Sequence, residues 1–543
     1  MESEGAPARH FLIPRRYVVV IMLCFVAVSA VITRDCTLIA AQYFVDDMFA
    51  NFTKDNRTDD DCMHLNDTRR PVFAFKKINM KRYHWNKKNY IDLNTFFYLG
   101  YGLSHLPSGI VSDKYGAKHV IEAALVSMAL TSMFTPFLIV QTHGSPTVVT
   151  IIRFFLGLCE GTLMPGAVSM IAHWVPRRER ATLTTIGGCG VNIGVLISQG
   201  ATEIIMMKSS DWTLPFYLYG GVTLGLLLLW HLLVYSNPHR DPHINPVERF
   251  YLDTEMSAIV DHKNKNIPIC RILCTLDVWS LSVIIGAYIL MYVYLIGHLR
   301  VYLSDVLKLH IGDRGIWTAI PFGVMIVTGF VMAIISDWAV NSGLVNVVMM
   351  RKVCTNIGKV ERGVLETTHP TVDRLQRCMG PAVYTLAASY AGCNRHLSVV
   401  MFIIATALMG SSLAGFRLII LEISPNYSGS VGAFCNSIGI ILASFTPKFV
   451  AWVVPNVTQD VHHAMKKTAR DATILWPTPN PTGPIFTTET LPPSLLINAG
   501  VNIVLTVPSK SEIPMSNFAS SLSITMPPAR WAKLYKFQLY FFT

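Results

Sequence analysis

An arginine and a glutamate stand seven residues apart inside an otherwise apolar run, as Arg153 and Glu160 of RFFLGLCEGTLMPGAVSMIAHW. Seven residues make nearly two helical turns, so both side chains would lie on one face, about 10.5 Å apart along the axis. That separation is too long for a direct salt bridge, but both groups could line one water-filled path. Arg153 would offer a forked donor to a carboxylate or phosphate, and Glu160 would take up and release a proton. The alternative interpretation is structural, with each charge paired to a neighbouring helix.

The composition of the whole chain shows in what kind of protein these charges stand. Hydrophobic residues make up 51% of the 543 and charged residues only 15%, whereas a soluble domain carries about 25% charged residues. The mean hydropathy is +0.41. The apolar residues form runs of about 18 or more, which is typical of transmembrane helices. The sequence therefore predicts an all-α polytopic membrane protein.

The segments between the apolar runs argue against several function classes. Lys and Arg, which produce the net charge of +11, cluster beside apolar runs as membrane topology requires, so we expect no nucleic-acid partner. The 11 cysteines lie mostly inside apolar runs, and no pair has metal-site spacing, so we expect no metal and no cofactor. The sequence has no nucleophile elbow, Walker loop or HExxH motif, and we expect no enzyme activity.

A polar segment divides the apolar runs into two halves. About eleven spans are recognisable, the fourth over residues 148–174 and the tenth over 397–421. The ninth is interrupted by a polar stretch, whose charges would each cost about 2.5–3.5 kcal/mol near the bilayer centre. The predicted organisation is a cytosolic N-terminus (1–16), an N-terminal six-helix bundle (17–235) with a glycosylatable loop (45–90), a central cytosolic linker (236–276), a C-terminal helical bundle (277–455) with a polar insert (359–378), and an atypical tail (456–543).

The first long loop carries opposing signals about membrane topology. Three glycosylation sequons, at Asn51, Asn56 and Asn66, favour a lumenal or extracellular position. The same loop holds ten Lys and Arg against seven Asp, which the positive-inside rule would place in the cytosol. The basic turns after later spans agree with the sequons. We therefore expect a cytosolic N-terminus, with the protein in the plasma membrane or in a lysosomal or vesicular membrane.

A short turn motif, GIVSDKYGAK, ends the second span. In it, Gly109 would allow two helices to approach closely, and Asp113 would meet a helix N-terminus or a basic group. Gly116 would permit a tight turn before Lys118. The corresponding segment of the second half, AIISDWAVNS, keeps Asp337 but lacks the glycines and the lysine. An aspartate-bearing turn after the second span of each half is the weak internal symmetry of a transporter built from repeats.

These motifs resemble the major facilitator superfamily, and more specifically its anion:cation symporter family, which includes sialin, the vesicular glutamate transporters and the type I sodium–phosphate cotransporters. The resembling stretches fall in order between about Arg15 and Pro455. They include RFFLGLCEGTLMPGAVSMIAHWVPRRERA, WTLPFYLYGGV, NPHRDPHINPVERFYL, RKVCTNIG and EISPNYSGSVGAFCNSIG. The resemblance implies a major facilitator fold of two pseudo-symmetric helical bundles with twelve spans, one more than the sequence shows.

The resemblance also implies roles for three of the charged residues. Family members carry an arginine and a glutamate at the positions of Arg153 and Glu160, with roles in anion binding and coupling. They carry a further arginine at the position of Arg34, which acts on the substrate anion. The neighbouring Asp35 differs from the family's usual apolar residue, and it could neutralise Arg34 and weaken anion binding.

Other differences from the family concern the substrate and the tenth span. Leu93 and Val168 stand where the glutamate-carrying members have histidines, so histidine-based proton gating is not available at those sites. This disfavours glutamate as the substrate and leaves phosphate and other organic anions open. Arg417 and Glu422 are five residues apart and point to different faces of a helix. For both we expect structural roles near the cytosolic end.

The predicted function is that of a glycosylated solute carrier, a secondary active transporter of an organic or inorganic anion of the carboxylate or phosphate type. Transport would proceed by alternating access, coupled to H⁺ or Na⁺, with the anion near the midplane between the halves. We expect a small anionic substrate and the lipid bilayer as partners, and a monomer. The alternative is a non-transporting membrane relative, receptor-like or regulatory, or the product of an aberrant gene model that contains the polar insert and the tail.

Overall fold

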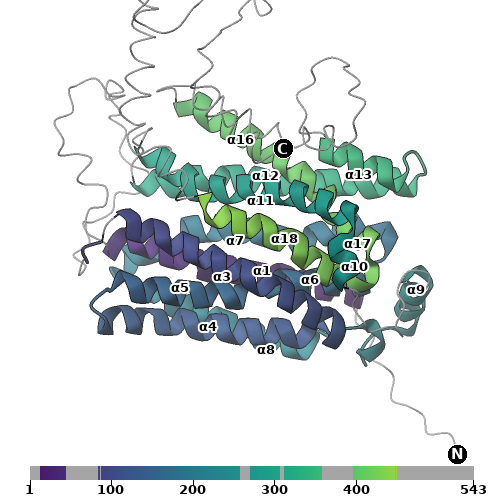
Figure 1. Ribbon diagram of the computed structural model, residues 1–543, viewed down its shortest axis with the longest axis horizontal. Helices are drawn as coiled ribbons and strands as arrows, with labels where there is room; N and C mark the ends of the chain where they lie inside the picture. The colour runs from purple at the N-terminus through teal and green to yellow at the C-terminus, as the bar shows by residue number, and fades with distance from the viewer. Residues whose placement is uncertain are drawn as a thin grey trace, which may run out of the picture. The chain divides into compact units, whose positions relative to one another are not determined.

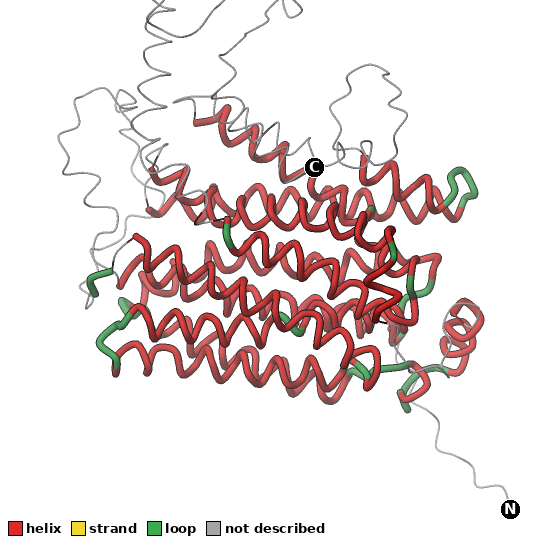
Figure 2. The backbone as a smooth tube through the Cα atoms, in the orientation of Figure 1, coloured by secondary structure: helices red, strands yellow, loops and turns green. Residues whose placement is uncertain are grey.

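The computed structural model describes residues 13–44, 83–85, 87–256, 269–305, 311–356, 384, 395–446 and 448, all of which belong to the compact unit Met1–Val453 (Figure 1). The elements named below are all α- or 3₁₀-helices, which Figure 2 shows as red tubes. Three predictions fall outside the described residues: the glycosylation sites Asn51, Asn56 and Asn66, the polar insert 359–378, and the tail 456–543.

The first half of the chain, residues 15–233, folds into long helices, which from residue 87 onward are joined by short turns. These turns are short enough that the spans they join run antiparallel. Pro146 and Pro215 stand in the first turns of two of these helices, where a missing backbone N–H leaves no hydrogen bond unmade. The helices are α1 (Arg15–Phe44), α3 (Lys87–Tyr115), α4 (Ala117–Gln141), α5 (Pro146–Glu160), α6 (Leu163–Trp174), η1 (Arg177–Glu179), α7 (Arg180–Ser209) and α8 (Leu214–Leu233).

The described residues of the second half, within 276–444, also form mainly long helices. Its helices are α11 (Leu276–Asp305), α12 (Ile311–Asn341), α13 (Val347–Asn356), α16 (Arg395–Ser411), η4 (Ser412–Ala414), α17 (Phe416–Ile423), η5 (Pro425–Tyr427) and α18 (Ser428–Ser444). The polar segment between the halves contains η2 (Pro238–Arg240), α9 (Pro246–Met256) and α10 (Ile269–Cys274). The halves pack together chiefly through α3 against α18 and α7 against α12.

Eight helical segments among the described residues are long and apolar enough to cross a bilayer. Two further helices have a place in the same bundle. Helix α3 is 29 residues long but carries polar groups such as His105 and Asp113, and α18 is described over 17 residues. The structure confirms the predicted all-α membrane class.

The fourth and tenth spans are each broken, which the sequence analysis did not predict. The first is divided into α5 and α6 around Gly161, and the second into α16, η4 and α17 around Gly415. The α5 break lies where that helix touches α3. A Cβ atom on Gly157 would collide with the carbonyl oxygen of Phe97, so only glycine allows the two backbones to approach this closely. Glu160 is the last residue of α5 and stands directly at the break.

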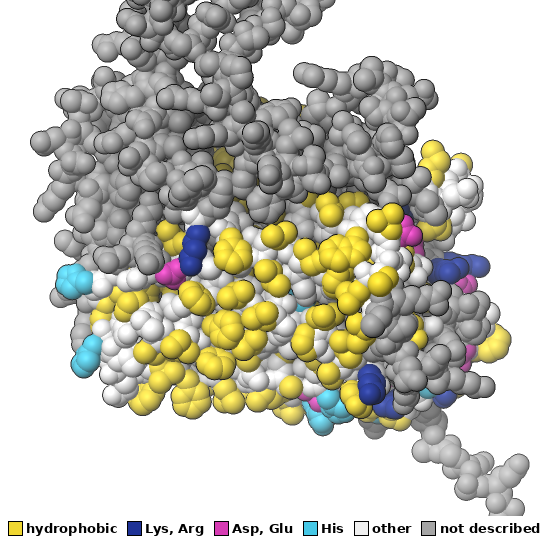
Figure 3. Space-filling model, in the orientation of Figure 1, with side chains coloured by type: hydrophobic (Ala, Val, Ile, Leu, Met, Phe, Trp, Pro, Cys, Tyr) yellow, Lys and Arg dark blue, Asp and Glu magenta, His cyan; other side chains and the backbone are white. Residues whose placement is uncertain are grey.

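The surface of the helical bundle matches a lipid environment. Large apolar side chains are exposed on several helices, among them Phe134 and Phe137 on α4, Leu228 and Leu232 on α8, and Trp338 on α12. Figure 3 shows hydrophobic side chains over most of the described face, with charged groups gathered mainly at the right-hand end near α9. In water such a surface would promote aggregation, whereas in the hydrocarbon core of a bilayer these side chains can face lipid.

Candidate functional site

Four charged side chains form a buried cluster between α1, α5 and α7. Arg34 on α1 donates from Nε to Asp35 Oδ1 at 3.0 Å and from Nη1 to Glu160 Oε1 at 3.4 Å. Ser198 of α7 donates to the other Asp35 oxygen at 3.0 Å. Arg34 is 7% exposed, Asp35 2%, Glu160 2% and Arg153 1%. The cluster is therefore an ion network removed from solvent.

Arg153 joins this cluster through the backbone of Arg34 rather than through a carboxylate. Its Nη1 donates to the carbonyl oxygen of Arg34, and its guanidinium lies 4.6 Å from the ring centroid of Phe97 on α3. The sequence spacing placed Arg153 and Glu160 too far apart to pair directly, and in the structure Arg34 bridges them. Asp35 pairs with Arg34, as the analysis of the sequence allowed.

Several polar atoms of the cluster have no partner in the described part of the chain. They are Nη2 of Arg34, Nε and Nη2 of Arg153, and Oε2 of Glu160, all buried. A buried guanidinium N–H without an acceptor costs free energy, on the order of 1–3 kcal/mol or more for a charged group. Three donors and one carboxylate oxygen are thus available to a ligand in one small region.

The charges of the cluster balance. With all four groups ionised, two arginines face two carboxylates and the net charge is zero, which is the arrangement that minimises the cost of burying ions. An added anion would leave the cluster negative by one unit. A proton taken up by Glu160 would restore neutrality, and Oε2 is the oxygen at which it would bind without breaking a contact.

Asp113 and Asp337 bind helix N-termini of the opposite half. Asp113, at the end of α3, accepts hydrogen bonds from the backbone N–H groups of Gly429 at 3.1 Å and Ser430 at 2.7 Å, and from the Ser430 hydroxyl at 2.7 Å. These residues begin α18. The carboxylate satisfies N–H groups that have no partner within the helix and faces the positive end of the helix dipole.

Asp337 makes the reciprocal contact from the second half to the first. It stands near the end of α12 and accepts from the backbone N–H groups of Ala181 at 3.0 Å and Thr182 at 2.7 Å, in the first turn of α7. The two aspartates occupy corresponding positions in the two halves. We call them the aspartate clamps, and the side of the bundle on which they lie the clamp side.

The other residues of the turn motif hold the backbone around Asp113. A Cβ on Gly109 would come within 2.6 Å of Ala433 and of the Gly429 carbonyl, so this glycine allows α3 to lie directly against α18. Gly116 has φ of 99°, a conformation that side chains rarely adopt. Lys118 donates from Nζ to the His231 carbonyl at 2.9 Å and ties α4 to α8.

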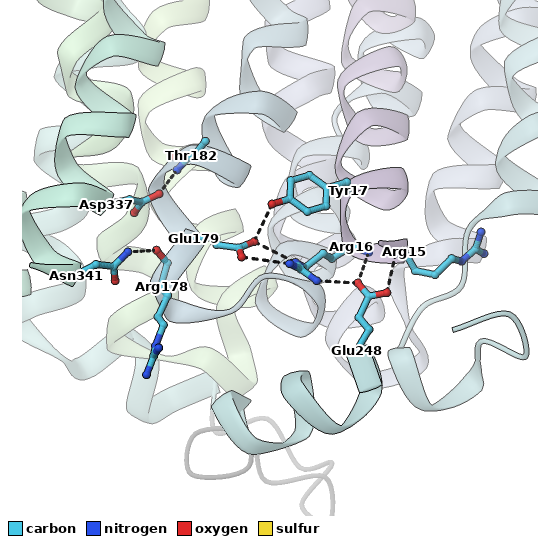
Figure 4. A network of polar contacts seen from close by, with 9 residues as sticks. All are labelled: Arg15, Arg16, Tyr17, Arg178, Glu179, Thr182, Glu248, Asp337 and Asn341. Carbon is cyan, nitrogen blue, oxygen red and sulfur yellow. Dashed lines mark hydrogen bonds and ion pairs between the residues drawn. The ribbon is translucent and has the colours of Figure 1, made fainter. Parts of the chain in front are cut away.

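A network of charged residues surrounds the clamp of Asp337 (Figure 4). Glu179 of η1 accepts from Arg16 Nε at 3.0 Å and Nη2 at 3.2 Å. Glu248 of α9 accepts from the backbone N–H of Arg15 at 2.8 Å and from that of Arg16 at 3.1 Å, and so caps α1. The linker helix α9 is therefore bound to the first helix on the clamp side.

Neutralising a clamp should open the clamp side. In Asp113→Asn the amide keeps the shape but loses the charge that faces the helix dipole, a loss of about 1–2 kcal/mol, or about 5- to 30-fold in the closed-to-open ratio. We expect a Cys introduced at Thr184, in the cavity described below, to react at least fivefold faster with an impermeant maleimide in the Asp113→Asn background. Asp337→Asn should raise the labelling rate in the same way. Asp211→Asn, which changes an exposed carboxylate outside the clamps, should leave the labelling rate unchanged. Unchanged labelling in both clamp variants would contradict the assignment.

A cavity of about 80 Å³ lies between the halves, lined by α1, α6, α7, α11, η4, α17 and α18. Arg34, Arg153 and Glu160 are not among its lining residues. Arg417 is the charged residue that lines it. Glu422 lies elsewhere, paired with Arg351 of α13 at 3.0 Å, which agrees with the structural role expected for it.

Arg417 is the residue whose position the sequence analysis missed. We expected it to serve structure near a helix end, whereas the structure places it beside the cavity between the halves. The signal available in the sequence was an arginine within an apolar span, the same signal that identified Arg153.

Comparison with known sequences identifies one family and two relatives. The profile of the Major Facilitator Superfamily matches residues 23–447. Sialin of Homo sapiens is 26% identical over 419 residues, which cover 76% of this chain and 78% of sialin. Sodium-dependent phosphate transport protein 3 of Homo sapiens is 21% identical over 375 residues, which cover 69% of this chain and 80% of that protein.

Among solved structures, a proton:xylose symporter of the same superfamily, bound to 6-bromo-6-deoxy-D-glucose, is 14% identical with a TM-score of 0.57. The match covers 82% of this chain and 90% of the symporter. At this identity the likeness concerns the fold. The proteins found by sequence are transport proteins rather than enzymes, which agrees with the expectation from the motifs.

Proposed function

This chain belongs to the Major Facilitator Superfamily, and on that premise we propose that it is a secondary active transporter that moves an anion together with a proton by alternating access. The anion would be of the carboxylate or phosphate type. It would bind to Arg153 and Arg34, and Glu160 would carry the coupled proton. The name of one relative, sodium-dependent phosphate transport protein 3, fits this class of substrate.

The observation that carries the proposal is the set of unpartnered donors in the buried cluster. Nη2 of Arg34 and Nε and Nη2 of Arg153 are buried without an acceptor in the described residues. A carboxylate or phosphate offers two or more acceptor oxygens in the geometry of a guanidinium fork. An anion held there would satisfy donors whose burial is otherwise costly.

Proton coupling follows from the charge balance of the cluster. A monoanion that enters a neutral network leaves one buried negative charge in excess, which is strongly unfavourable in low dielectric. A proton on Glu160 removes that excess and weakens the hold of Glu160 on Arg34 Nη1, which frees a further donor for the anion. Anion and proton would therefore bind together and cross as an electroneutral pair.

The same residues favour H⁺ over Na⁺ as the coupling ion. A sodium ion beside Glu160 would need several oxygen ligands, and the carboxylates near it already face Arg34. It would also lie close to two guanidinium groups. A proton needs one free carboxylate oxygen, and Oε2 of Glu160 supplies it.

Alternating access would operate through the aspartate clamps. They join the halves on the clamp side, so this side would open when both release their helix N-termini. The basic residues Lys114, Lys118, Arg177 and Arg178 stand at the same side. By the positive-inside rule we place the clamp side and the N-terminus in the cytosol, in a plasma membrane or a lysosomal or vesicular membrane.

The proposal is tested by reconstitution of the full chain in liposomes with verified orientation. Radiolabelled hippurate, glucuronate and inorganic phosphate are each presented under an imposed pH gradient. We expect at least one to accumulate above its equilibrium ratio, to lose that accumulation when a protonophore collapses the gradient, and to do so equally when choline replaces Na⁺. Protein-free liposomes are the control. No uptake of any anion under any imposed ion gradient would favour a non-transporting membrane protein instead.

A further inference from the structure

The cavity between the halves is lined by one charged side chain, that of Arg417, and by mostly apolar side chains. We propose that Arg417 and this cavity form a second anion-binding site, on the clamp side of the charged cluster, which takes an organic monoanion with an apolar body. The anionic group would bind Arg417, and the apolar body would lie along the wall. This inference rests on the proposed anion transport and specifies the class of substrate.

Arg417 is available for a ligand. Its guanidinium lies 5.5 Å from the ring centroid of Tyr288 on α11, and its Nη1 would be 3.7 Å from a Cβ on Gly188 of α7. It makes this cation–π contact and has no ion pair with any residue that the structure describes. The charge is half-buried, so part of its hydration is lost without a counter-ion. The guanidinium of Arg417, which belongs to the second half, therefore lies beside Gly188 of the first half at the edge of the cavity.

Two hydroxyl groups support an anion at the same place. Oγ1 of Thr184 and Oγ1 of Thr185 line the cavity and are buried without a hydrogen-bond partner in the described part of the chain. Thr185 is 2% exposed. Each hydroxyl has an O–H to donate. A carboxylate between α17 and α7 could therefore accept from Arg417 and from α7 together.

The remaining wall determines what kind of anion fits. Ile285, Tyr288, Phe416 and Ile420 contribute aliphatic and aromatic surface, and most other lining residues are apolar as well. A phosphate dianion would lose its water here for a single cation and a few hydroxyls, which is unfavourable. A monoanion with an apolar body would instead gain binding free energy, because burying each methylene against the apolar lining removes it from water.

The position of Arg417 along its span places it in a second binding site rather than in the charged cluster of Arg153 and Glu160. Glu160 is the middle residue of the span Pro146–Trp174, and Arg153 lies seven residues before it, away from the clamp side. Arg417 lies about eight residues beyond the middle of the span His396–Ile423, towards the clamp side. The two arginines therefore stand on opposite sides of the middle, and the cavity is lined by Arg417 but by no residue of the charged cluster.

The test measures equilibrium binding to the purified full chain in detergent by calorimetry, in the Arg153→Lys background, so that the first anion site does not contribute. The ligands are acetate, propanoate, butanoate and pentanoate, with butanamide as the neutral analogue and inorganic phosphate as the hydrated anion. We expect affinity to rise about three- to fourfold per methylene until the cavity is filled, which corresponds to about 0.8 kcal/mol per methylene. Butanamide and phosphate should each bind at least tenfold more weakly than butanoate.

Two substitutions connect the binding to Arg417. Arg417→Gln should weaken butanoate binding at least tenfold, Arg417→Lys should retain most of it, and Arg249→Gln, the same change at an exposed arginine of α9, should leave it unchanged. Affinity that does not depend on chain length, or butanoate binding that Arg417→Gln leaves intact, would overturn the inference. If Arg153-dependent anion uptake persists in that case, the transport proposal stands and only the second site is lost. If no anion is transported but butanoate binds through Arg417, the transport proposal fails and the site remains.

Discussion

Arg153→Lys should reduce anion uptake by about 100-fold or more while the protein still reaches the membrane. Lysine keeps the positive charge and can still donate to the Arg34 carbonyl, the contact made by Arg153 Nη1. It cannot supply the two further donors, Nε and Nη2, that have no partner within the described protein. Two hydrogen bonds to a charged ligand, at about 1.5 kcal/mol each, amount to about 100-fold in rate or affinity, since each 1.36 kcal/mol is tenfold.

The measurement is the initial rate of uptake in proteoliposomes, normalised to the amount of correctly oriented protein. Arg240→Lys, on the short helix η2 outside the cluster, is the matched control and should keep the wild-type rate. Lysine and arginine differ in fork geometry rather than in charge, so the comparison separates binding geometry from electrostatics. Normal uptake by a well-expressed Arg153→Lys protein would remove Arg153 from the binding site.

Glu160→Gln should abolish accumulation driven by a pH gradient and preserve exchange of anion for anion. Glutamine has the shape of a protonated glutamic acid but cannot release a proton. The cluster then holds Arg34 and Arg153 against Asp35 alone, with a net charge of +1, and accepts an anion without a proton. We expect the accumulation ratio to fall to about the equilibrium value, with exchange that no longer depends on pH between 5.5 and 7.5.

Two assays on the same liposomes separate coupling from folding. Gradient-driven uptake and counterflow with internal unlabelled anion are measured side by side, and Glu122→Gln serves as the control because Glu122 is a half-buried carboxylate of α4 outside the cluster. Loss of both activities would indicate that Glu160 mainly stabilises the fold, since the change removes one carboxylate from a buried ion network. Retained gradient-driven accumulation would show that another group carries the proton.

Much of the architecture was predictable because hydrophobic runs and turn residues act locally. The long apolar runs predicted the membrane class and most of the described helices, since a span needs only length and apolar composition. The order of the motifs predicted the family, and the superfamily profile over residues 23–447 together with the relatives confirms it. The breaks at Gly161 and Gly415 were missed, because a single glycine within an apolar run does not by itself show whether a helix is interrupted there.

The residue types of the candidate site were also visible in the sequence, since an ionisable group in a span is costly unless it has a partner or a function. Arg153 and Glu160 were selected on that ground, Asp113 and Asp337 from the turn motif, and Arg34 from the family resemblance. Their functional roles remain proposals. The spacing of Arg153 and Glu160 predicted a shared path on one helix. It could not reveal that Arg34, 126 residues before Glu160 in the chain, lies between them.

Which charges meet was decided by the tertiary structure alone. Asp113 reaches Ser430, 317 residues away, and Asp337 reaches Thr182, 155 residues away, because the two halves present helix N-termini to each other. Arg417 and Glu422 are both charged residues in the same predicted span. In the structure Arg417 lines a cavity, whereas Glu422 pairs with Arg351. Composition and spacing depend on neighbours along the chain, whereas partnership of a buried charge depends on which helices pack together. That packing is a property of the whole bundle.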